Sequence, residues 1–357
     1  MGHVVAVVGA TGRIAASRHV RDSLVPLMAE GRLDDVLLVG RDEGRLADVA
    51  DANGGLRYTT DLDKAVSDPA IDVFLDATGP MTRARFAGSF LAAGKHVLTE
   101  KPTGLTARKA LEMVRVARDA GVNAAMVQDK LFTPGFDALR RAVTDGKIGS
   151  YYTVTGEFGY WVDDGLAPGT TGQRPSWNYR SRDGGSLSSD LFTHWSYLLE
   201  LVGQPVQVRA ISSMHIPRRR DEQGDIYACD LPDTLYVSGL LAGGVSFDIR
   251  SSWVMRPFRP FTLTVHGSLA TVSASPTRAV VYSASGAMHE DGLDLAVRAP
   301  TDEFRALWAD FLDAIEQRPG DVSSLESGYR AAVLCEAIDE SASCGTAIDV
   351  SRAREES

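Results

Sequence analysis

The sequence has few cysteines, no long apolar run and no excess of basic residues. Its three cysteines, Cys229, Cys335 and Cys344, are odd in number and show no CxxC spacing. A disulfide framework or a metal site is therefore not expected, and a cytoplasmic location is favoured. No apolar stretch reaches the ~20 residues that a membrane span needs. The start of the chain shows no signal-peptide pattern, so no membrane partner is expected.

The charge balance is acidic, with 37 lysines and arginines against 47 aspartates and glutamates. A nucleic-acid-binding domain normally has the opposite balance, so no nucleic-acid partner is expected. The basic run Arg218–Arg220 is followed at once by acidic residues and is interpreted as a solvated loop. At 357 residues the chain is long enough for two domains with cores of full size.

Strand and helix signals alternate along the first part of the chain. Strands separated by helices indicate an α/β domain with a doubly wound parallel sheet of the Rossmann type, assigned to residues 1–126. The predicted strands are 4–8, 36–39, 71–75, 95–99 and 123–127. The predicted helices are 14–30, 45–52, 86–93 and 107–120.

The remaining residues, 127–357, contain longer strand signals. Several of these alternate apolar and polar residues, which predicts an α+β substrate-binding domain built on a large open antiparallel sheet. The open face favours a homodimer or homotetramer. The predicted strands are 151–158, 206–213, 234–241, 245–252, 261–267 and 270–273, and helical signals return at 304–317 and 325–342.

A glycine turn joins the first strand to the first helix with the spacing GxxGxxA, from Gly9 to Ala15. Glycine is needed there because the turn is tight and the backbone must approach a pyrophosphate at the helix N-terminus. A plain strand-to-helix turn is the alternative, but the position at the start of a β-α-β series favours dinucleotide binding.

The second strand ends in Val39-Gly40-Arg41, without a carboxylate. A guanidinium suits the 2′-phosphate of NADP(H), which is slightly preferred over NAD(H). In the alternative, Arg41 is solvated and Asp42 serves NAD. Thr78 and Gly79, after the third strand, are expected to line the same cleft.

The tripeptide Glu100-Lys101-Pro102 follows the strand predicted at 95–99. Ligands of open α/β sheets bind at the carboxyl ends of the strands, where Lys101 falls. The proline fixes the backbone and can hold a cis peptide, which sets the direction of the lysine. The predicted cofactor-binding residues are therefore Gly9, Thr11, Gly12, Arg13, Ile14, Arg41, Thr78, Gly79, Glu100 and Lys101.

A helix predicted over 186–201 carries Asp190, His194 and Tyr197 on one face, because their spacing is i, i+4, i+7. Histidine suits proton transfer near neutral pH. The alternative is a buried structural histidine bonded to Asp190. Trp177, Tyr179 and Arg180 are predicted to bind substrate, since polar–aromatic loops such as 177–180 often line polyol pockets. Tyr197 is predicted to bind substrate from the polar face of the helix.

These motifs together resemble the Gfo/Idh/MocA family of oxidoreductases, most specifically over 92–102 and from Gly185 to His194. The resemblance covers nearly the full chain. It implies that Lys101 contacts the substrate hydroxyl and the nicotinamide ribose, and that Asp190 and His194 bind substrate, with His194 often the acid–base. The chain departs from the family in its glycine spacing and in having Phe192 and Tyr197 where a glycine and a carboxylate are common.

The resemblance implies hydride transfer between NAD(P) and a ring carbon of a sugar, anhydrosugar, cyclitol or keto-sugar. Lys101, His194 and Asp190 are the expected catalytic residues, with Lys101 and His194 sharing the reacting oxygen. The alternatives are a non-catalytic NAD(P)-sensing regulator and an imine or enone reductase on the same fold.

Overall fold

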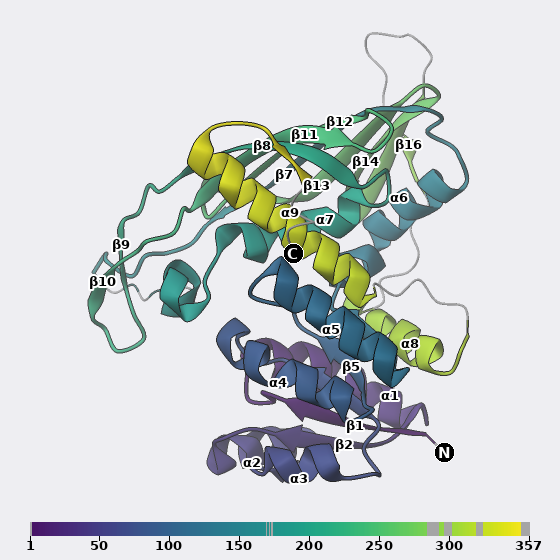
Figure 1. The fold of residues 1–357 in the computed structure, drawn as a ribbon, viewed down its shortest axis with the longest axis vertical. Coiled ribbons are helices and arrows are strands. Elements are labelled where there is room, and N and C mark those ends of the chain that lie inside the picture. The colour runs from purple at the N-terminus through teal and green to yellow at the C-terminus, as the bar shows by residue number, and fades with distance from the viewer. Residues whose placement is uncertain are drawn as a thin grey trace. The chain divides into compact units, whose positions relative to one another are not determined.

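The computed structural model describes residues 2–168, 170, 172, 174–283, 293–295, 302–318 and 324–350. The chain divides into two compact units (Figure 1). The first comprises Met1–Phe132 and Thr301–Tyr329, and the second comprises Thr133–Pro300 and Arg330–Ser357.

The first unit contains a six-stranded, entirely parallel sheet in the order β3-β2-β1-β4-β5-β6. This confirms the predicted Rossmann sheet. The strands are β1 His3–Val8, β2 Leu33–Val39, β3 Arg57–Thr59, β4 Val73–Asp76, β5 His96–Thr99 and β6 Ala124–Met126. The helices are η1 Ala15–Leu24, α1 Val25–Ala29, α2 Glu43–Ala52, α3 Leu62–Ser67, α4 Pro80–Ala92, α5 Ala107–Ala120, η2 Asp129–Phe132 and α8 Glu303–Ile315.

Each face of this sheet carries its own core, because successive strand residues point to opposite sides. Val5 and Val7 of β1 belong to one cluster, whereas Ala6 and Val8 belong to the other. The first cluster also contains Trp308 of α8. The sequence predicted a helix at 304–317 and placed it in the second domain, residues 127–357. In the structure α8 belongs to the first unit.

The second unit contains a nine-stranded sheet in the order β16-β15-β14-β13-β7-β12-β11-β8-β17. Its neighbours are antiparallel except β7 and β12, which are parallel, so the expected antiparallel sheet is in fact mixed. The strands are β7 Tyr151–Trp161, β8 Pro205–Ser213, β11 Thr234–Leu241, β12 Ser246–Ser252, β13 Val254–Gly267, β14 Ala270–Ser275, β15 Arg278–Ser283, β16 Leu293–Asp294 and β17 Ile348–Asp349.

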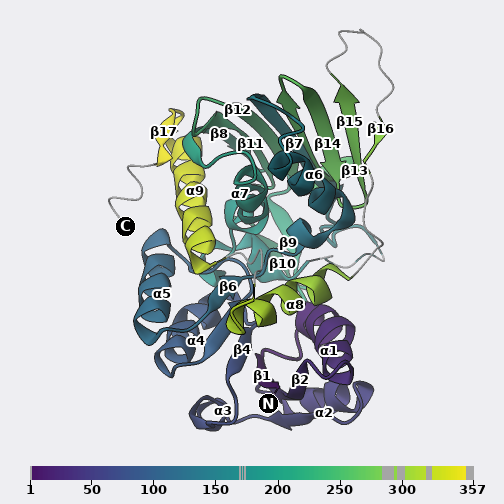
Figure 2. The same ribbon diagram turned by 90° about the vertical axis from the view of Figure 1, so that its right-hand side faces the viewer.

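Helices cover one face of this large sheet, namely α6 Pro134–Thr144, α7 Thr193–Leu199 and α9 Leu325–Cys344 (Figure 2). Short helical turns, η3 Ser176–Tyr179, η4 Ser181–Asp183 and η5 Ser188–Phe192, precede α7. The helix predicted over 186–201 is therefore split into a π-helical turn and α7. A separate hairpin pairs β9 Arg218–Arg220 with β10 Ile226–Ala228.

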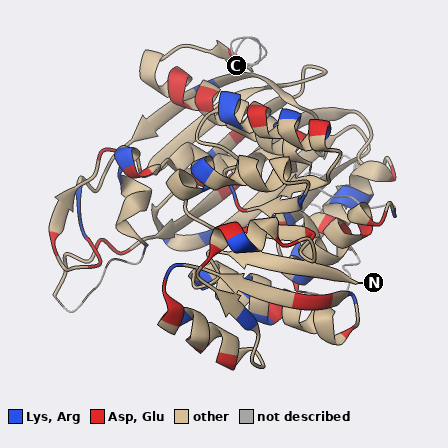
Figure 3. Ribbon diagram, turned by 60° about the horizontal axis from the view of Figure 1, so that its bottom comes forward, with Lys and Arg blue, Asp and Glu red and all other residues tan. Residues whose placement is uncertain are grey.

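The interpretation of Arg218–Arg220 as a solvated loop is wrong, because the run forms β9 and Arg219 is only 2% exposed. Apart from β9, which consists of three arginines, acidic and basic residues are spread over many elements (Figure 3). No helix in the described part of the chain combines the length and apolar character that crossing a membrane requires. Among the same residues, no group of three or more His, Cys, Asp or Glu side chains could hold a metal ion.

Candidate active site

The turn between β1 and η1 brings the backbone close to its neighbours in the sheet. Gly9 has φ +83°, and a Cβ there would lie 2.9 Å from the carbonyl oxygen of Ala77. The Gly9 amide donates to the carbonyl of Val39 at 2.9 Å, and the Gly12 amide donates to the carbonyl of Gly9 at 2.9 Å. The helix η1 follows directly, and amides in a first helical turn favour anions. The turn therefore fits a pyrophosphate.

A cavity of about 170 Å³ lies at the carboxyl ends of β1, β2 and β4. Four predicted cofactor residues line it: Gly9, Thr11, Arg41 and Thr78. The other lining residues are Val8, Val39, Gly40, Thr60, Leu62 and Thr82.

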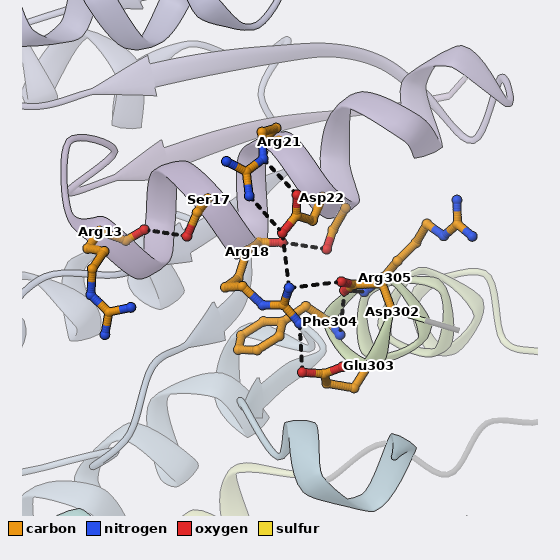
Figure 4. Close-up of polar contacts among 10 residues, drawn as sticks. Arg13, Ser17, Arg18, Arg21, Asp22, Asp302, Glu303, Phe304 and Arg305 are labelled. Carbon is orange, nitrogen blue, oxygen red and sulfur yellow. Dashed lines mark hydrogen bonds and ion pairs between the residues drawn. The ribbon is translucent and has the colours of Figure 1, made fainter. Parts of the chain in front are cut away.

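Sequence reasoning missed the hydroxyls of Thr60 and Thr82, because it missed β3 and began α4 too late. Gly12, Arg13 and Ile14 form the turn and the start of η1, and Gly79 is the N-cap of α4. Ser17 donates to the carbonyl of Arg13 at 2.6 Å (Figure 4).

Two arginines lie at the β2 side of this cavity. Arg41 lines it, and Arg45 Nη2 donates to the carbonyl of Thr11 at 3.1 Å. The carboxylate of Asp42 accepts from the Arg45 amide at 3.1 Å and caps α2. Among the described residues that line the cavity there is no aspartate or glutamate. Arg41 is thus the charged side chain among the residues that line the cavity.

Lys101 follows β5 at the carboxyl edge of the same sheet, and its peptide bond to Pro102 is cis. The adjacent Glu100 lies within hydrogen-bond distance of His19 Nε2, at 3.0 Å, and accepts from the Lys101 amide at 3.3 Å. Burial alone would raise the pKa of Glu100, but the hydrogen bond with His19 and the charges of Arg83 and Lys101 hold that pKa below its ordinary value.

In the second unit, the Asp190 carboxylate is held by an arginine that sequence reasoning missed. Arg174 Nη1 donates to Asp190 Oδ2 at 2.7 Å, and the guanidinium lies 4.5 Å over the ring of Trp253. Burial would lower the pKa of Arg174, but the charge of Asp190 raises it overall. Nothing in the sequence marks this pair, because Arg174 lies sixteen residues upstream in a segment without a periodic pattern.

His194, the second residue of α7, contacts Tyr197, which is also a predicted substrate-binding residue. Its Nδ1 lies 2.6 Å from the Tyr197 hydroxyl, and its ring packs edge-on against Phe261 at 5.5 Å. When Nδ1 carries the proton it donates to Tyr197, and Nε2 is then a base; in the other tautomer Nε2 carries the proton. The predicted shared face of His194 and Tyr197 is thus a direct contact.

The three residues predicted from the loop 177–180 differ in exposure and partners. Trp177 is 38% exposed, whereas Tyr179 is 2% exposed and packs against Trp253. Arg180 lies 4.0 Å over the Tyr227 ring and 3.5 Å from Asp221. These contacts favour a packing role for Tyr179 and Arg180 and leave Trp177 as the exposed aromatic.

Residues 4–128 match the family described as "Oxidoreductase family, NAD-binding Rossmann fold", and residues 136–273 match the "GFO/IDH/MocA C-terminal domain". The chain is 40% identical to D-xylose dehydrogenase of Paenarthrobacter nicotinovorans over 269 residues, which are 71% of this chain and 69% of the relative.

Solved structures show the same fold over nearly the whole chain. Levoglucosan dehydrogenase in complex with NADH and L-sorbose superposes with a TM-score of 0.85 at 21% identity, covering 98% of this chain and 99% of that one. The super-repressor mutant of Gal80p from Saccharomyces cerevisiae gives 0.82 at 16% identity, covering 99% of each chain.

The family match and these relatives show that the chain is an NAD(P)-dependent oxidoreductase acting on CH–OH or C=O groups. The chain belongs to the Gfo/Idh/MocA family, whose members among its relatives include sugar and cyclitol dehydrogenases.

Proposed function

We propose that this enzyme transfers a hydride between NADP(H) and a ring carbon of a sugar, anhydrosugar, cyclitol or keto-sugar. The observation that carries the substrate class is the 40% identity with a D-xylose dehydrogenase. The nicotinamide, when bound, accepts or supplies the hydride. The protein binds and orients both reactants and handles the proton of the reacting hydroxyl.

In the oxidation direction, His194 takes the hydroxyl proton at Nε2. This requires its ring proton on Nδ1, where the Tyr197 oxygen accepts at 2.6 Å. Lys101 hydrogen-bonds the same substrate oxygen and stabilises the alkoxide charge that develops there. Tyr197 is therefore the residue that orients His194.

In this proposal Asp190 binds substrate, whereas Tyr197 orients His194. Its ion pair with Arg174, stacked on Trp253, presents fixed donors and acceptors at a side-chain exposure of 12% for Asp190 and 22% for Arg174. Such a pair suits a substrate diol, since the carboxylate accepts from one hydroxyl while the guanidinium donates to its neighbour. Trp177, Tyr179 and Arg180 would then shape the surroundings of that diol.

The preference for NADP(H) rests on the β2 side of the cavity. Arg41 lines it, and Asp42, the alternative partner for a ribose hydroxyl, caps α2 instead. The turn from Gly9 to Ile14, with Thr78 and Gly79 opposite, would hold the pyrophosphate and the adjoining ribose. Glu100 and Lys101 would adjoin the nicotinamide half.

Two further properties belong to the same proposal. The exposed face of the nine-stranded sheet suits association into a homodimer or homotetramer. The free thiols of Cys229, Cys335 and Cys344 suit the reducing cytoplasm.

The second candidate function is the non-catalytic NAD(P)-sensing regulator. Its support is the likeness to Gal80p, which at 16% identity concerns the fold alone. A sensor that turns nothing over has no need of an acid–base group such as His194. The experiment that separates the candidates follows reduced nicotinamide by absorbance, with NADP and NAD against pentoses, hexoses, anhydrosugars and cyclitols. Turnover of a sugar supports the proposal. Tight cofactor binding without turnover supports a sensor, and activity confined to imines or enones supports the third alternative.

A further inference from the structure

Two buried hydrogen-bond networks in the first unit end on the residues that flank Lys101. The first begins on α8, where Trp308 Nε1 donates to His19 Nδ1 at 2.9 Å. His19 Nε2 lies 3.0 Å from Glu100 Oε1, and Glu100 Oε2 accepts from the Lys101 amide at 3.3 Å. Trp308 and His19 are both completely buried.

The Trp308 indole fixes the tautomer of His19. An indole nitrogen can only donate, so Nδ1 of His19 accepts and carries no proton. The ring proton is then on Nε2, which donates it to the Glu100 carboxylate. The orientation of Glu100 is thus set from α8 through the imidazole.

The second network is built on Arg83 of α4, which is 2% exposed. Its Nη1 donates to the Pro102 carbonyl at 2.8 Å, and its Nη2 donates to the Thr78 carbonyl. Its Nε lies 3.9 Å from Asp76, whose other carboxylate oxygen accepts from Thr78. One guanidinium thus ties the turn after β4 to the residue after Lys101.

Burying polar and charged groups costs free energy, so these networks contribute little to the stability of the fold. Burial lowers the pKa of Arg83 even though Asp76 and Glu100 oppose the shift, and its Nε has no hydrogen-bond partner. Apolar side chains of similar size often stabilise a protein as well as buried charges do. Hydrogen bonds, unlike apolar contacts, fix the orientation of the groups that they join.

The attachment of α8 to η1 does not rest on His19 alone, although its ring also packs edge-on against Phe304 at 4.9 Å. Arg18, its neighbour on η1, contacts Asp22, Asp302 and Glu303, and its guanidinium lies 5.2 Å over the Phe304 ring (Figure 4). Apolar residues of α8 pack into the same core. The His19–Trp308 hydrogen bond is therefore one of several contacts that dock this helix, and it is the one that continues through His19 to Glu100.

We propose that His19, Trp308 and Arg83 are positioning residues that fix Lys101 from both sides. The inference rests on the proposed function, in which Lys101 contacts the reacting oxygen. Glu100 is held by His19 on one flank and the Pro102 carbonyl by Arg83 on the other, so the backbone that carries the amine is restrained. A misplacement of about 1 Å can cost on the order of a hundredfold in rate.

The test compares His19→Leu, His19→Gln and Arg83→Lys with a matched control, His3→Gln. His3 also contacts a carboxylate, that of Asp72, but it begins β1 at the opposite edge of the sheet. We expect His19→Leu to lower kcat about tenfold or more, with a change in KM below about threefold. Glutamine can still donate to Glu100 and should restore most of kcat. Arg83→Lys should lower kcat, because lysine lacks the fixed fork with which Nη1 and Nη2 reach the two carbonyls.

The decisive readout repeats His19→Leu in a Lys101→Ala background. A residue that acts through Lys101 has no further effect once the amine is gone. Equal loss of kcat in both backgrounds, or a loss from His3→Gln as large as that from His19→Leu, would overturn the proposal. If Lys101→Ala itself kept wild-type kcat, the proposed role of Lys101 would fail instead, so the two failures are distinguishable.

A second readout needs no turnover. The rate at which the Lys101 amine reacts with an acylating reagent, followed by peptide mass spectrometry, should change severalfold in His19→Leu and stay constant in His3→Gln. An unchanged rate in His19→Leu would also overturn the proposal. Thermal midpoints measured on the same variants identify any that fail to fold. If His19→Leu is one of them, Arg83→Lys carries the comparison in both backgrounds.

Discussion

At the scale of single residues, the proposed chemistry rests on a few side chains whose hydrogen-bond contacts suggest separate tasks. Asp42 caps α2, and Arg41 is the charged side chain among the residues that line the cavity. His194 is bonded to Tyr197, and Asp190 is bonded to Arg174. Each pairing assigns a separate task, and each can be tested by one substitution.

Arg41→Ala should raise KM for NADP about tenfold or more while changing KM for NAD less than about threefold, because it removes a charge-assisted contact to the 2′-phosphate. Steady-state kinetics with both cofactors measures this. Arg57→Ala is the matched control, since Arg57 begins β3 and pairs with Asp35. Equal changes with both cofactors would show that Arg41 does not select between them.

Tyr197→Phe should lower kcat about tenfold and shift the pH profile of kcat/KM, because His194 loses the hydroxyl oxygen that accepts its Nδ1 proton in the proposed mechanism. The KM for the sugar should change little. Tyr236→Phe, at a 46% exposed position on β11, serves as the control. A pH profile identical to that of the wild type would contradict the orienting role of Tyr197.

At the scale of elements, the sequence specified best those segments whose signals are local. The helix at 107–120 was predicted to the residue, since Thr106 caps its start and Gly121 ends it with φ 65°. The strand at 234–241 was also predicted to the residue, and Gly243 and Gly244 turn it into β12.

Elements shaped by distant contacts were predicted less well. Only the last half of β13 was anticipated, because Pro257 and Pro260 lie in its irregular first part, where the pairing with β7 shifts register. The sequence predicted one helix over 186–201 and gave no sign of the π-helical turn η5 before α7. The Arg174–Asp190 pair was missed because Arg174 lies in a segment without a periodic pattern, whereas the shared face of His194 and Tyr197 followed from spacing alone.

The contact between α9 and η5 predicts a dependence of stability on pH. Asp339 of α9 accepts from Ser188 at 2.8 Å, and burial, with a smaller contribution from Glu336, raises its pKa to about 6 despite this hydrogen bond. A carboxyl with a raised folded pKa binds its proton more tightly in the folded state. Its contribution to stability therefore falls as pH rises from about 4 to about 6.

Asp339→Asn should remove this dependence, since asparagine can still accept from Ser188 without a charge. The variant should gain up to about 2–3 kcal/mol in free energy of unfolding near pH 8 and little near pH 4. Denaturant unfolding at both pH values measures the difference. A gain of the same size at both would show that charge burial is not the cause.

At the scale of the whole molecule, the chain forms two units, and the first is completed by a segment from near the C-terminus. Sequence patterns predicted α8 as a helix but not the unit to which it belongs. The apolar face of a helix shows that the helix packs against a core, but not which core. Trp308 could be assigned to the Rossmann core only from the structure.

The exposed sheet face predicts self-association. Ile211 of β8 and Tyr236 of β11 pair directly across the two strands and are 63% and 46% exposed. Replacing both with lysine should convert an oligomer to a monomer, as measured by light scattering after gel filtration, because two charges would be buried without partners. Met81→Lys, at a 48% exposed position on α4, should not change the mass.

The measurement that tests the central claim most directly is kcat/KM for NADP-dependent oxidation of D-xylose, or of the best sugar found, in Lys101→Ala and His194→Ala. Each substitution should lower kcat/KM about a hundredfold or more, because each removes a group that acts on the reacting oxygen. Values near wild type for both variants would contradict the account.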